Sequence, residues 1–455
     1  MNLFAVSLRN VRVRLLSSVL TTVSIMIGTA LLASLWLLRE EIDRGYKASI
    51  GGYRAVVGSK DSSPLELTMS TVLNLGVPQG VVKLSTYTDL HEDRLPRRCH
   101  VRYAIPQARG DTYSRFHFPI IGTTDEMFSA FELGGKDQHL EFARGEAWRF
   151  GHQDLMRVAE QKAELAQHMA EHAGHGHEGH DHSINLPASW RRAVIGSKVA
   201  RQLDLDLGAE IVPVHGRQDE VGSHTHDDFA CAVSGVLAPT NTPIDRAVFI
   251  PLGTFLSMDD HVAVREAEGA EAGDVLLSAI VAKPRHHVGD RHLELLFQTR
   301  SDAQVAVPAK EIPRLMEWIG GAKQVLEIVS YLVLIVAAAS VLVALYNTMN
   351  ERRREIAIMR SLGARRPQIV RVILQEAALI ALVGAALGVL LCHAAAWAFG
   401  GLVEDLAGVA VDWAAFSTAE LWLILAVGAL GGLAGILPAI KGSLTPVAEH
   451  LGPIS

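Results

Sequence analysis

The stretch NERRREIAIMRSLGARRPQIVRVILQEA (Asn350–Ala377) lies between two long apolar runs and is rich in arginine. Before a Leu-Gly step, apolar residues recur at the spacing of a short amphipathic helix at a membrane surface, namely Ile356, Met359 and Leu362. Gly363 can adopt the left-handed conformation that ends such a helix. Pro367 then suits the first turn of a second helix, which continues into the next apolar run. The stretch therefore predicts a helix–turn–helix loop between two membrane spans.

Four apolar runs are each long enough to cross the bilayer, which needs about 20 residues for about 30 Å of hydrocarbon. They are Leu15–Leu38, Ile328–Tyr346, Ala377–Gly401 and Leu421–Ile440. The last two are rich in glycine and alanine, which favours close contact between helices in lipid. The first run is longer than the apolar core of a cleaved signal peptide, so it is interpreted as a retained anchor.

The charges flanking these runs predict the orientation of the chain. The loop Asn350–Arg371 carries seven arginines against two glutamates, whereas Gly400–Glu420 carries four acidic residues and neither lysine nor arginine. Residues 1–14 carry three arginines and no acidic residue. Basic loops remain in the cytoplasm, so both termini and the arginine-rich loop are expected there. For a chain of bacterial character, the sequence predicts a multi-pass inner-membrane protein whose long segment 39–327 lies in the periplasm.

The domain plan follows from these spans. The fold class expected is an α-helical membrane protein with four transmembrane helices and an α+β periplasmic domain inserted between the first and second spans. The segments are 1–14, a cytoplasmic amphipathic helix; 15–38, the first span; 39–327, the periplasmic domain, with a helical and histidine-rich insertion at 154–183; 328–346, the second span; 350–371, the cytoplasmic loop; 377–401, the third span; 402–420, a periplasmic loop; 421–440, the fourth span; and 441–455, a cytoplasmic tail.

Within the long segment, several short runs beside glycine turns read as strands: AVVGSK, AVIGSK, CAVSGVL, RAVFIPL and VLLSAIVAKP. VIGSKVARQLDLDLGAEI predicts a strand, a helix, a turn and another strand. DLMRVAEQKAELAQHMAEHA (Asp154–Ala173) is rich in helix formers, with Asp154 as an N-cap candidate. The mixture predicts an α+β domain.

The predicted helix runs into HAGHGHEGHDHS (172–183), which places five histidines within twelve residues with glycines between them. His168 and His172 are four apart and share one helical face, while the others form two H-x-H pairs. Imidazoles at this density bind zinc, nickel or copper; the alternative is a mobile polar loop with weak accidental affinity. The candidate ligands are His168, His172, His175, His177, His180 and His182, with His224 and His226 in SHTHDD as a weaker second cluster that reads equally as an ordinary polar loop.

The remaining composition excludes several classes of function. The net charge is −7, which gives no basic footprint for nucleic acid. The sequence has neither a Walker A motif nor H-E-x-x-H, so the chain itself is not expected to be an enzyme. With three cysteines there is no disulfide framework, and the sequence leaves open whether Cys99 and Cys231 pair. His393, inside the third predicted span, is interpreted as a packed and hydrogen-bonded residue rather than a transport site.

The arginine-rich loop resembles the cytoplasmic coupling loop of MacB/FtsX-type ABC transporter permeases. The residues that match the family pattern of a basic, glutamate-containing helix ending in Leu-Gly-Ala are Glu355, Arg360, Leu362, Gly363 and Ala364. Ala357 stands where the family commonly has glycine. The tail LPAIKGSLTPVAEHL (Leu437–Leu451) is similar to the closing pattern of the family, although Ala448 interrupts its Val-Glu step.

The resemblance implies a permease subunit that pairs as a homodimer in lipid, is driven by a separate cytoplasmic ABC ATPase, and works on the periplasmic side with a substrate-binding or adaptor protein. ATP would then act only through the partner subunit. The histidine tract adds the hypothesis that the system handles a divalent metal such as zinc. The alternative is a non-transporting membrane receptor or scaffold whose periplasmic domain senses metal or binds a partner.

Overall fold

The computed structural model describes two compact units. One, called the helical unit, contains residues 1–42, 318–406 and 410–455; the other, the α+β domain, contains 43–317 and 407–409. The residues that the structure describes are 15–50, 52–134, 138–172, 187–215, 225–258, 273–315, 361, 363–407, 414 and 416–443, with scattered positions between 324 and 343.

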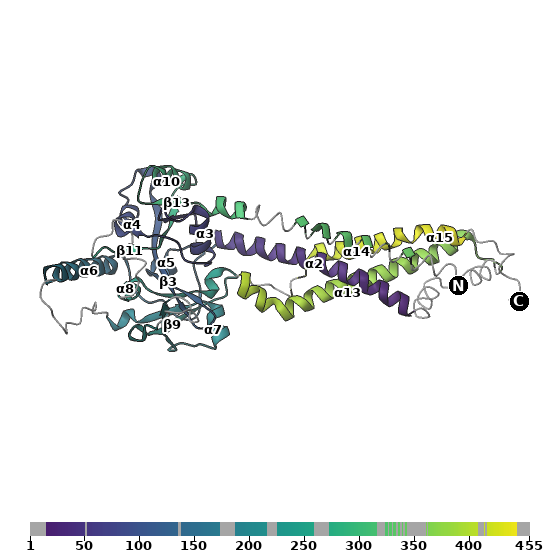
Figure 1. The fold of residues 1–455 in the computed structure, drawn as a ribbon, viewed down its shortest axis with the longest axis horizontal. Coiled ribbons are helices and arrows are strands. Elements are labelled where there is room, and N and C mark those ends of the chain that lie inside the picture. Colours follow the sequence, from purple (N-terminus) through teal and green to yellow (C-terminus); the bar gives the residue numbers. More distant parts are fainter. Residues whose placement is uncertain are drawn as a thin grey trace. The chain divides into compact units, whose positions relative to one another are not determined.

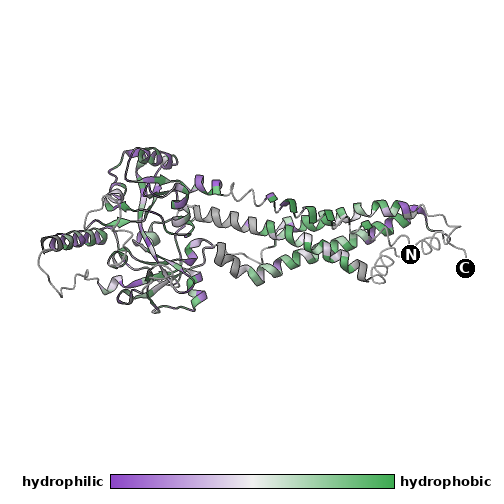
Figure 2. Cartoon of the chain, in the orientation of Figure 1, coloured by the Kyte–Doolittle hydropathy of each residue, from purple (hydrophilic) through white to green (hydrophobic). Residues whose placement is uncertain are grey.

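The helical unit is built from long apolar helices, whose hydrophobic character is visible along α13 and α14 in Figure 2. The helices are α2 (Leu15–Ile50), α13 (Arg366–Ala407), α14 (Thr418–Ala434) and α15 (Ile436–Ser443). Within the described residues, three stretches are long and apolar enough to cross a membrane: Val19–Leu37, Arg366–Gly401 and Thr418–Lys441. They correspond to the first, third and fourth predicted spans.

Part of the second predicted span, Ile328–Tyr346, lies outside the described residues, and its described positions are helical. The count of four spans therefore stays a prediction. The fourth span is divided at Gly435, which caps α14 and separates it from α15.

Glycines bring the helices of this unit into close contact. A Cβ on Gly388 of α13 would lie 2.6 Å from the carbonyl oxygen of Met26, and one on Gly384 would lie 2.9 Å from Ile25, both in α2. On α14, a Cβ on Gly431 would lie 2.2 Å from the methyl group of Ala381. Small residues four apart let helix backbones approach in lipid, where apolar burial gives little driving force. The sequence prediction of close helix contact is confirmed.

The α+β domain is organised around a mixed sheet with the order β13-β1-β12-β3-β4-β10-β6-β9-β5, with β7 added to β9 and β8 added to β3. Most neighbours are antiparallel, but β10 runs parallel to β4 and β6 runs parallel to β9. The strands are β1 (Ala55–Gly58), β3 (Val101–Tyr113), β4 (Phe118–Thr123), β5 (Phe142–Gly145), β6 (Arg192–Ile195), β7 (Glu210–Ile211), β8 (Val214–His215), β9 (Cys231–Leu237), β10 (Val248–Pro251), β12 (Ala279–Pro284) and β13 (Gln304–Ala306), with β2 (Val82–Lys83) and β11 (Leu276–Leu277) forming a separate pair.

Short helices pack around this sheet, and each follows from a local signal (Figure 1). Helix α3 starts with a capping box in which Ser63 and Glu66 cap each other, with Pro64 in the first turn. Helix α7 ends at Asp204, whose φ of 50° is left-handed. The helices are α3 (Pro64–Val72), α4 (Leu84–His91), α5 (Glu126–Ser129), α6 (His152–His172), α7 (Ser197–Leu203), α8 (Leu252–Leu256) and α10 (Gly289–Gln298).

A buried arginine ties the long strand β3 to the end of α3. The guanidinium of Arg109 donates hydrogen bonds to the backbone carbonyls of Ser70 and Thr71 and to the side chains of Asn74 and Gln107. Burial lowers the pKa of Arg109 to about 10. A cation at a helix C-terminus is favourable because the carbonyl dipoles point toward it. The helix end and the side-chain oxygens therefore compensate the buried charge of Arg109, as a carboxylate would in a salt bridge.

Most of the strand predictions in this domain are confirmed. CAVSGVL is β9, and VIGSKVARQLDLDLGAEI contains β6, α7 and β7 in the predicted order. Two details are corrected. VLLSAIVAKP forms two strands, β11 and β12, instead of one, and α6 begins at His152 with Asp154 inside its first turn, where its carboxylate accepts from the N–H of Gly151.

The three cysteines are described, and Cys99, Cys231 and Cys392 are each buried and free. Burial raises the pKa of the Cys231 thiol to about 12, so this thiol is protonated near neutral pH. The pairing that the sequence left open is therefore not formed in this structure.

Candidate functional site

The arginine-rich loop ends in a tight turn at Gly363. Its φ is +95°, the left-handed conformation predicted from the Leu-Gly step. Helix α13 begins immediately afterwards, and the side chain of Gln368 accepts a hydrogen bond from the N–H of Arg365 at 2.8 Å. Pro367 lies in the first turn, as predicted. The helix therefore has a fixed starting point directly after the turn.

The first turns of α13 pack against α15. Ile369, Ile373 and Ala439 form one buried cluster, with Val370 and Leu374 packed around it. Ala439 belongs to LPAIKGSLTPVAEHL, so the two stretches that carry the family resemblance, 350–377 and 437–451, meet in space. Packed side chains of this kind transmit displacement because interiors have low compressibility. A push on the turn would reach both α13 and α15.

Of the five residues predicted to form the coupling element, Gly363 and Ala364 lie in the described turn. Glu355, Arg360 and Leu362 lie outside the described residues, as does the amphipathic helix expected before the turn.

A buried hydrogen-bonded pair joins α13 to α14 further along the helices. Nε2 of His393 lies 3.1 Å from Oε1 and 3.2 Å from Oε2 of Glu420, and the ring of Phe416 packs on the imidazole with its centroid 4.1 Å away. Next to it, the hydroxyl of Ser34 in α2 lies 3.3 Å from the Cys392 sulfur. His393 is thus packed and hydrogen-bonded, as expected. The sequence analysis missed Glu420 as its partner, because Glu420 also reads as the capping-box residue of Ser417.

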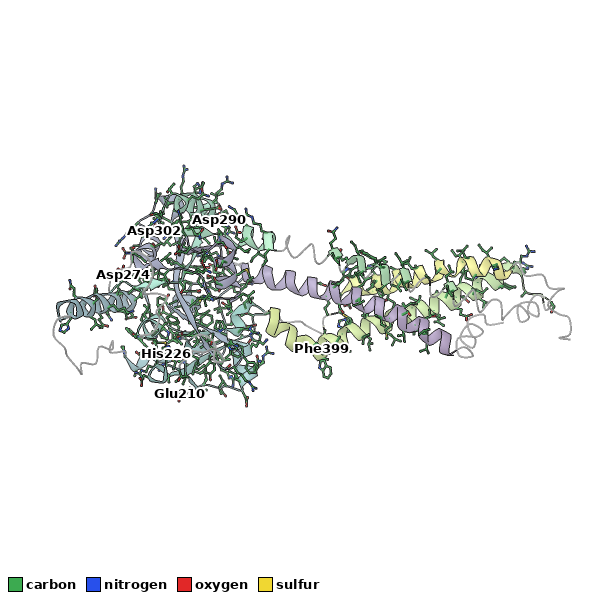
Figure 3. The ribbon with its side chains drawn as sticks, in the orientation of Figure 1. Glu210, His226, Asp274, Asp290, Asp302 and Phe399 are labelled. Carbon is green, nitrogen blue, oxygen red and sulfur yellow. The ribbon has the colours of Figure 1, made fainter. Side chains whose placement is uncertain are left out.

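Large exposed aromatic side chains surround the same ends of α13 and α14. Phe399 points away from α13 (Figure 3), and Trp397 and Trp422 are also exposed. Tryptophan is enriched at the level where hydrocarbon meets the lipid headgroups. The exposed tryptophans are therefore expected at a bilayer boundary, close to the His393–Glu420 pair.

The predicted metal ligands are only partly described. His168 is exposed on α6, and His172 is the last residue of that helix. His175, His177, His180, His182 and His224 lie outside the described residues. Among the described residues, no group of three or more histidine, cysteine, aspartate or glutamate side chains is placed to hold a metal ion.

His226, labelled in Figure 3, is buried rather than part of an exposed polar loop. Its Nε2 lies 3.9 Å from Oδ2 of the buried Asp111, and its ring contacts Phe229 edge-on with centroids 6.4 Å apart. These contacts give His226 a packing role in the α+β domain. The sequence pattern SHTHDD carried no signal of burial.

Comparison with known proteins places these observations in a family. Residues 327–444 match the family described as "FtsX-like permease C-terminal". This part of the chain therefore resembles the C-terminal domain of FtsX-like permeases. It contains every predicted coupling residue, the turn at Gly363 and the His393–Glu420 pair.

Individual relatives support the same assignment. A macrolide export ATP-binding/permease protein MacB of Escherichia coli is 31% identical over 121 residues, which are 25% of this chain and 18% of the relative. The corresponding protein of Sodalis glossinidius is 32% identical over 120 residues, 26% of this chain and 18% of that protein. The matched region thus spans less than a fifth of these relatives. The resemblance of the permease domain to MacB/FtsX-type ABC transporter permeases is confirmed.

Proposed function

We propose that this chain is the transmembrane permease subunit of an ABC transporter, driven by a separate cytoplasmic ATPase. The observation that carries the proposal is the left-handed turn at Gly363, which leads into α13, and the packing of α13 on α15, all within the segment that matches the FtsX-like permease family. The relatives are named as combined ATP-binding and permease proteins. The sequence contains no Walker A motif, and in this proposal the ATPase is a separate partner subunit.

In this proposal the turn receives force from the ATPase and passes it along α13. The residues that form the coupling element are Glu355, Arg360, Leu362, Gly363 and Ala364. Contacts through Gly388 and Gly431 keep α2, α13 and α14 close enough to move together. The work is delivered to the α+β domain, which we assign to the periplasm.

The arginine-rich loop and the acidic segment 400–420 support an inner-membrane chain with both termini in the cytoplasm. Homodimerisation, contact with lipid and a periplasmic substrate-binding or adaptor protein belong to the same proposal through the family resemblance.

A cysteine cross-link tests the proposed partner directly. Arg365 is exposed beside the turn, and the three native cysteines are buried, so Arg365→Cys adds one reactive thiol. In membranes of the native host, a thiol-directed photo-cross-linker on position 365 should capture an ABC ATPase. The matched control, Phe416→Cys, is exposed near the opposite end of the spans and should not capture it. If position 365 captures no ATPase, the receptor or scaffold hypothesis is favoured.

Labelling of the same cysteine tests the orientation. A membrane-impermeant maleimide should label Leu207→Cys, in an exposed part of the α+β domain, in intact spheroplasts. It should label Arg365→Cys only after the cytoplasmic face is opened. The reverse pattern would contradict the assigned topology.

We also propose that the histidine tract gives the system a link to a divalent metal, with zinc as the first candidate. The exposed position of His168, near the end of α6, is compatible with this role, since a ligand must reach solvent to bind the ion. Titration of Zn²⁺ into the full-length protein should show binding that is lost on deletion of residues 168–182. Equal binding with and without the deletion would show that the tract is not the site.

A further inference from the structure

Two histidines that no sequence motif singles out form a stacked pair in the α+β domain. His91 ends α4, and His152 begins α6. Their ring centroids are 4.2 Å apart, and the ring planes differ by only 13°. Both side chains are about three-quarters buried. The stack therefore joins the start of α6 to α4.

A single hydroxyl serves both rings. The Tyr87 oxygen lies 3.1 Å from Nδ1 of His152 and 3.4 Å from Nδ1 of His91. A phenol has one hydrogen to donate, so one imidazole must accept at Nδ1 while the other donates. Burial, followed by the charges of Glu126, Asp125 and Glu92, raises the pKa of Tyr87, so the hydroxyl keeps its proton. This arrangement suits two neutral rings of opposite tautomer.

Acidic groups face the pair from each surrounding element. On the α4 side, Oε1 of Glu92 lies 3.5 Å from Nε2 of His152, and Asp93 follows it in the chain. From α5, Oε1 of Glu126 lies 3.8 Å from Nδ1 of His91. The other charged groups around the cluster are Arg94, which pairs with Glu92, together with Asp125 at the start of α5, Arg149 before α6 and Asp154 in the first turn of α6.

The charges do not favour a doubly protonated pair. Burial, and then the charge of His152, lower the pKa of His91, although Glu92 and Asp93 oppose the shift. Burial and the charge of Asp125 raise the pKa of Glu126 to about 7. As the pH falls, Glu126 therefore becomes neutral before His91 gains a charge. Glu126 is then unable to compensate a second imidazolium.

The geometry differs from that of a metal site. In parallel stacked rings the nitrogen lone pairs point in parallel directions, so they do not converge on one ion. Among the described residues, no three histidine, cysteine, aspartate or glutamate side chains are placed to hold a metal ion, and this includes the surroundings of the histidine pair.

We propose that His91 and His152 form a proton-operated latch for α6. While the pair carries at most one positive charge, the rings stack and share the Tyr87 hydroxyl. A second proton places two like charges 4.2 Å apart and leaves the Tyr87 hydroxyl with two donors. The rings then separate, and the first turn of α6 loses its contact with α4.

The loosening is local, because other contacts hold the rest of the helix. Leu155 and Val158 of α6 are buried in the core of the domain, and the carboxylate of Asp154 accepts from the N–H of Gly151. Helix α6 extends from the body of the domain (Figure 1) and leads into the histidine tract. The pH around the domain would therefore control how firmly the first turn of α6, the helix that precedes the tract, is held against α4. This control is independent of the proposed ATPase coupling.

Hydrogen–deuterium exchange of the full-length protein tests the latch. Protection of peptides that cover residues 152–160, corrected for intrinsic exchange, is compared at pH 7.5 and 5.5. We expect the wild type to lose protection there at pH 5.5, by about tenfold, because the first turn of the helix opens locally. Helix α10 should keep its protection and so report that the domain remains folded.

Single substitutions then assign the effect to the pair. In His91→Gln, and separately in His152→Gln, only one imidazole remains, so the pH-dependent step should be absent. His292→Gln is the matched control, because His292 is partly exposed on α10 and contacts the Val288 carbonyl, and it should keep the step. If His152→Gln already lowers the protection of α6 at pH 7.5, the His91→Gln variant alone tests the proposal. A step that persists in His91→Gln, or its absence in the wild type, would overturn the proposal.

Discussion

Nε2 of His393 in α13 lies 3.1 Å from Oε1 of Glu420 in α14, and both side chains are buried. Removing one partner leaves a buried polar group without its main contact, at a cost of about 3–5 kcal/mol where the group is charged. We expect Glu420→Ala to lower the melting temperature of the protein in detergent more than Glu420→Gln, which keeps an acceptor. Thermal unfolding followed by tryptophan fluorescence measures this.

A double-mutant cycle with His393→Ala separates the interaction from the loss of packing. The effects of the two alanine substitutions should be far from additive, because the second removes a group that the first has already left without its partner. Additive effects would show that the two side chains contribute independently.

Close contact at Gly388 makes a second prediction. A side chain there would collide with the backbone of α2 at Met26 and Ala30, which cannot rotate away. Gly388→Leu should therefore separate α2 from α13 and lower thermal stability, by about 1–3 kcal/mol or more. Gly401→Leu, on the same helix, meets no atom within 4 Å and should be tolerated. Equal losses in the two variants would contradict this packing of α2 on α13.

The buried Arg109 should be among the most sensitive positions of the α+β domain. Arg109→Met leaves the carbonyls of Ser70 and Thr71 and the Gln107 side chain without their donor, at a cost of at least about 3 kcal/mol in total. Arg109→Lys should be intermediate, since an ammonium has fewer donors than a guanidinium. Urea unfolding provides the measurement, with the exposed Arg201→Met as control. A stability of Arg109→Met equal to that of the control would argue against the proposed anchor.

The raised pKa of Glu126 predicts a pH-dependent effect. A carboxyl whose pKa rises on folding, in this case from 4.5 to about 7, contributes stability that is present below pH 4.5 and lost as the pH rises through about 7. Glu126→Gln removes the buried charge, so it should raise the melting temperature at pH 8 by about 2–4 °C for each kcal/mol recovered. It should have little effect at pH 5.

Glu160 is an exposed carboxyl on α6, and Glu160→Gln serves as the control. It should change neither the melting temperature at pH 8 nor the one at pH 5. A gain for Glu126→Gln that is equal at the two pH values would show that the charge is not its cause.

The sequence could predict the membrane helices and many short strands because each depends on local patterns. Length and hydropathy are sufficient for α13, and Gly363 alone predicts a left-handed turn. Strand β3 was missed because it contains charged and polar residues, including Arg109 and Asp111, whose burial depends on distant partners. The sequence also gives no sign that β10 pairs in parallel with β4.

The candidate sites also differ in whether local sequence or long-range packing forms them. The left-handed turn at Gly363 could be predicted from a continuous motif. The pairs His393–Glu420 and His91–His152 could not, because each joins residues far apart in the chain that only packing brings together. The burial of His226 could not be predicted for the same reason, since its neighbour Asp111 comes from β3.

The central claim is that the turn at Gly363 couples an ATPase to the helices. Gly363 and Gly208 both have positive φ values, +95° and +84°, and a Cβ at either meets no atom within 4 Å. A valine at either position therefore introduces similar backbone strain, about 1–2 kcal/mol. Only the strain at Gly363 lies in the proposed coupling element.

The direct test is ATP hydrolysis by the complex purified from the native host and reconstituted in lipid. We predict that Gly363→Val sharply reduces either the recovery of the ATPase with the chain or its turnover, whereas Gly208→Val preserves both. If no ATPase accompanies the wild-type chain, or if Gly363→Val behaves like Gly208→Val, the coupling account is wrong.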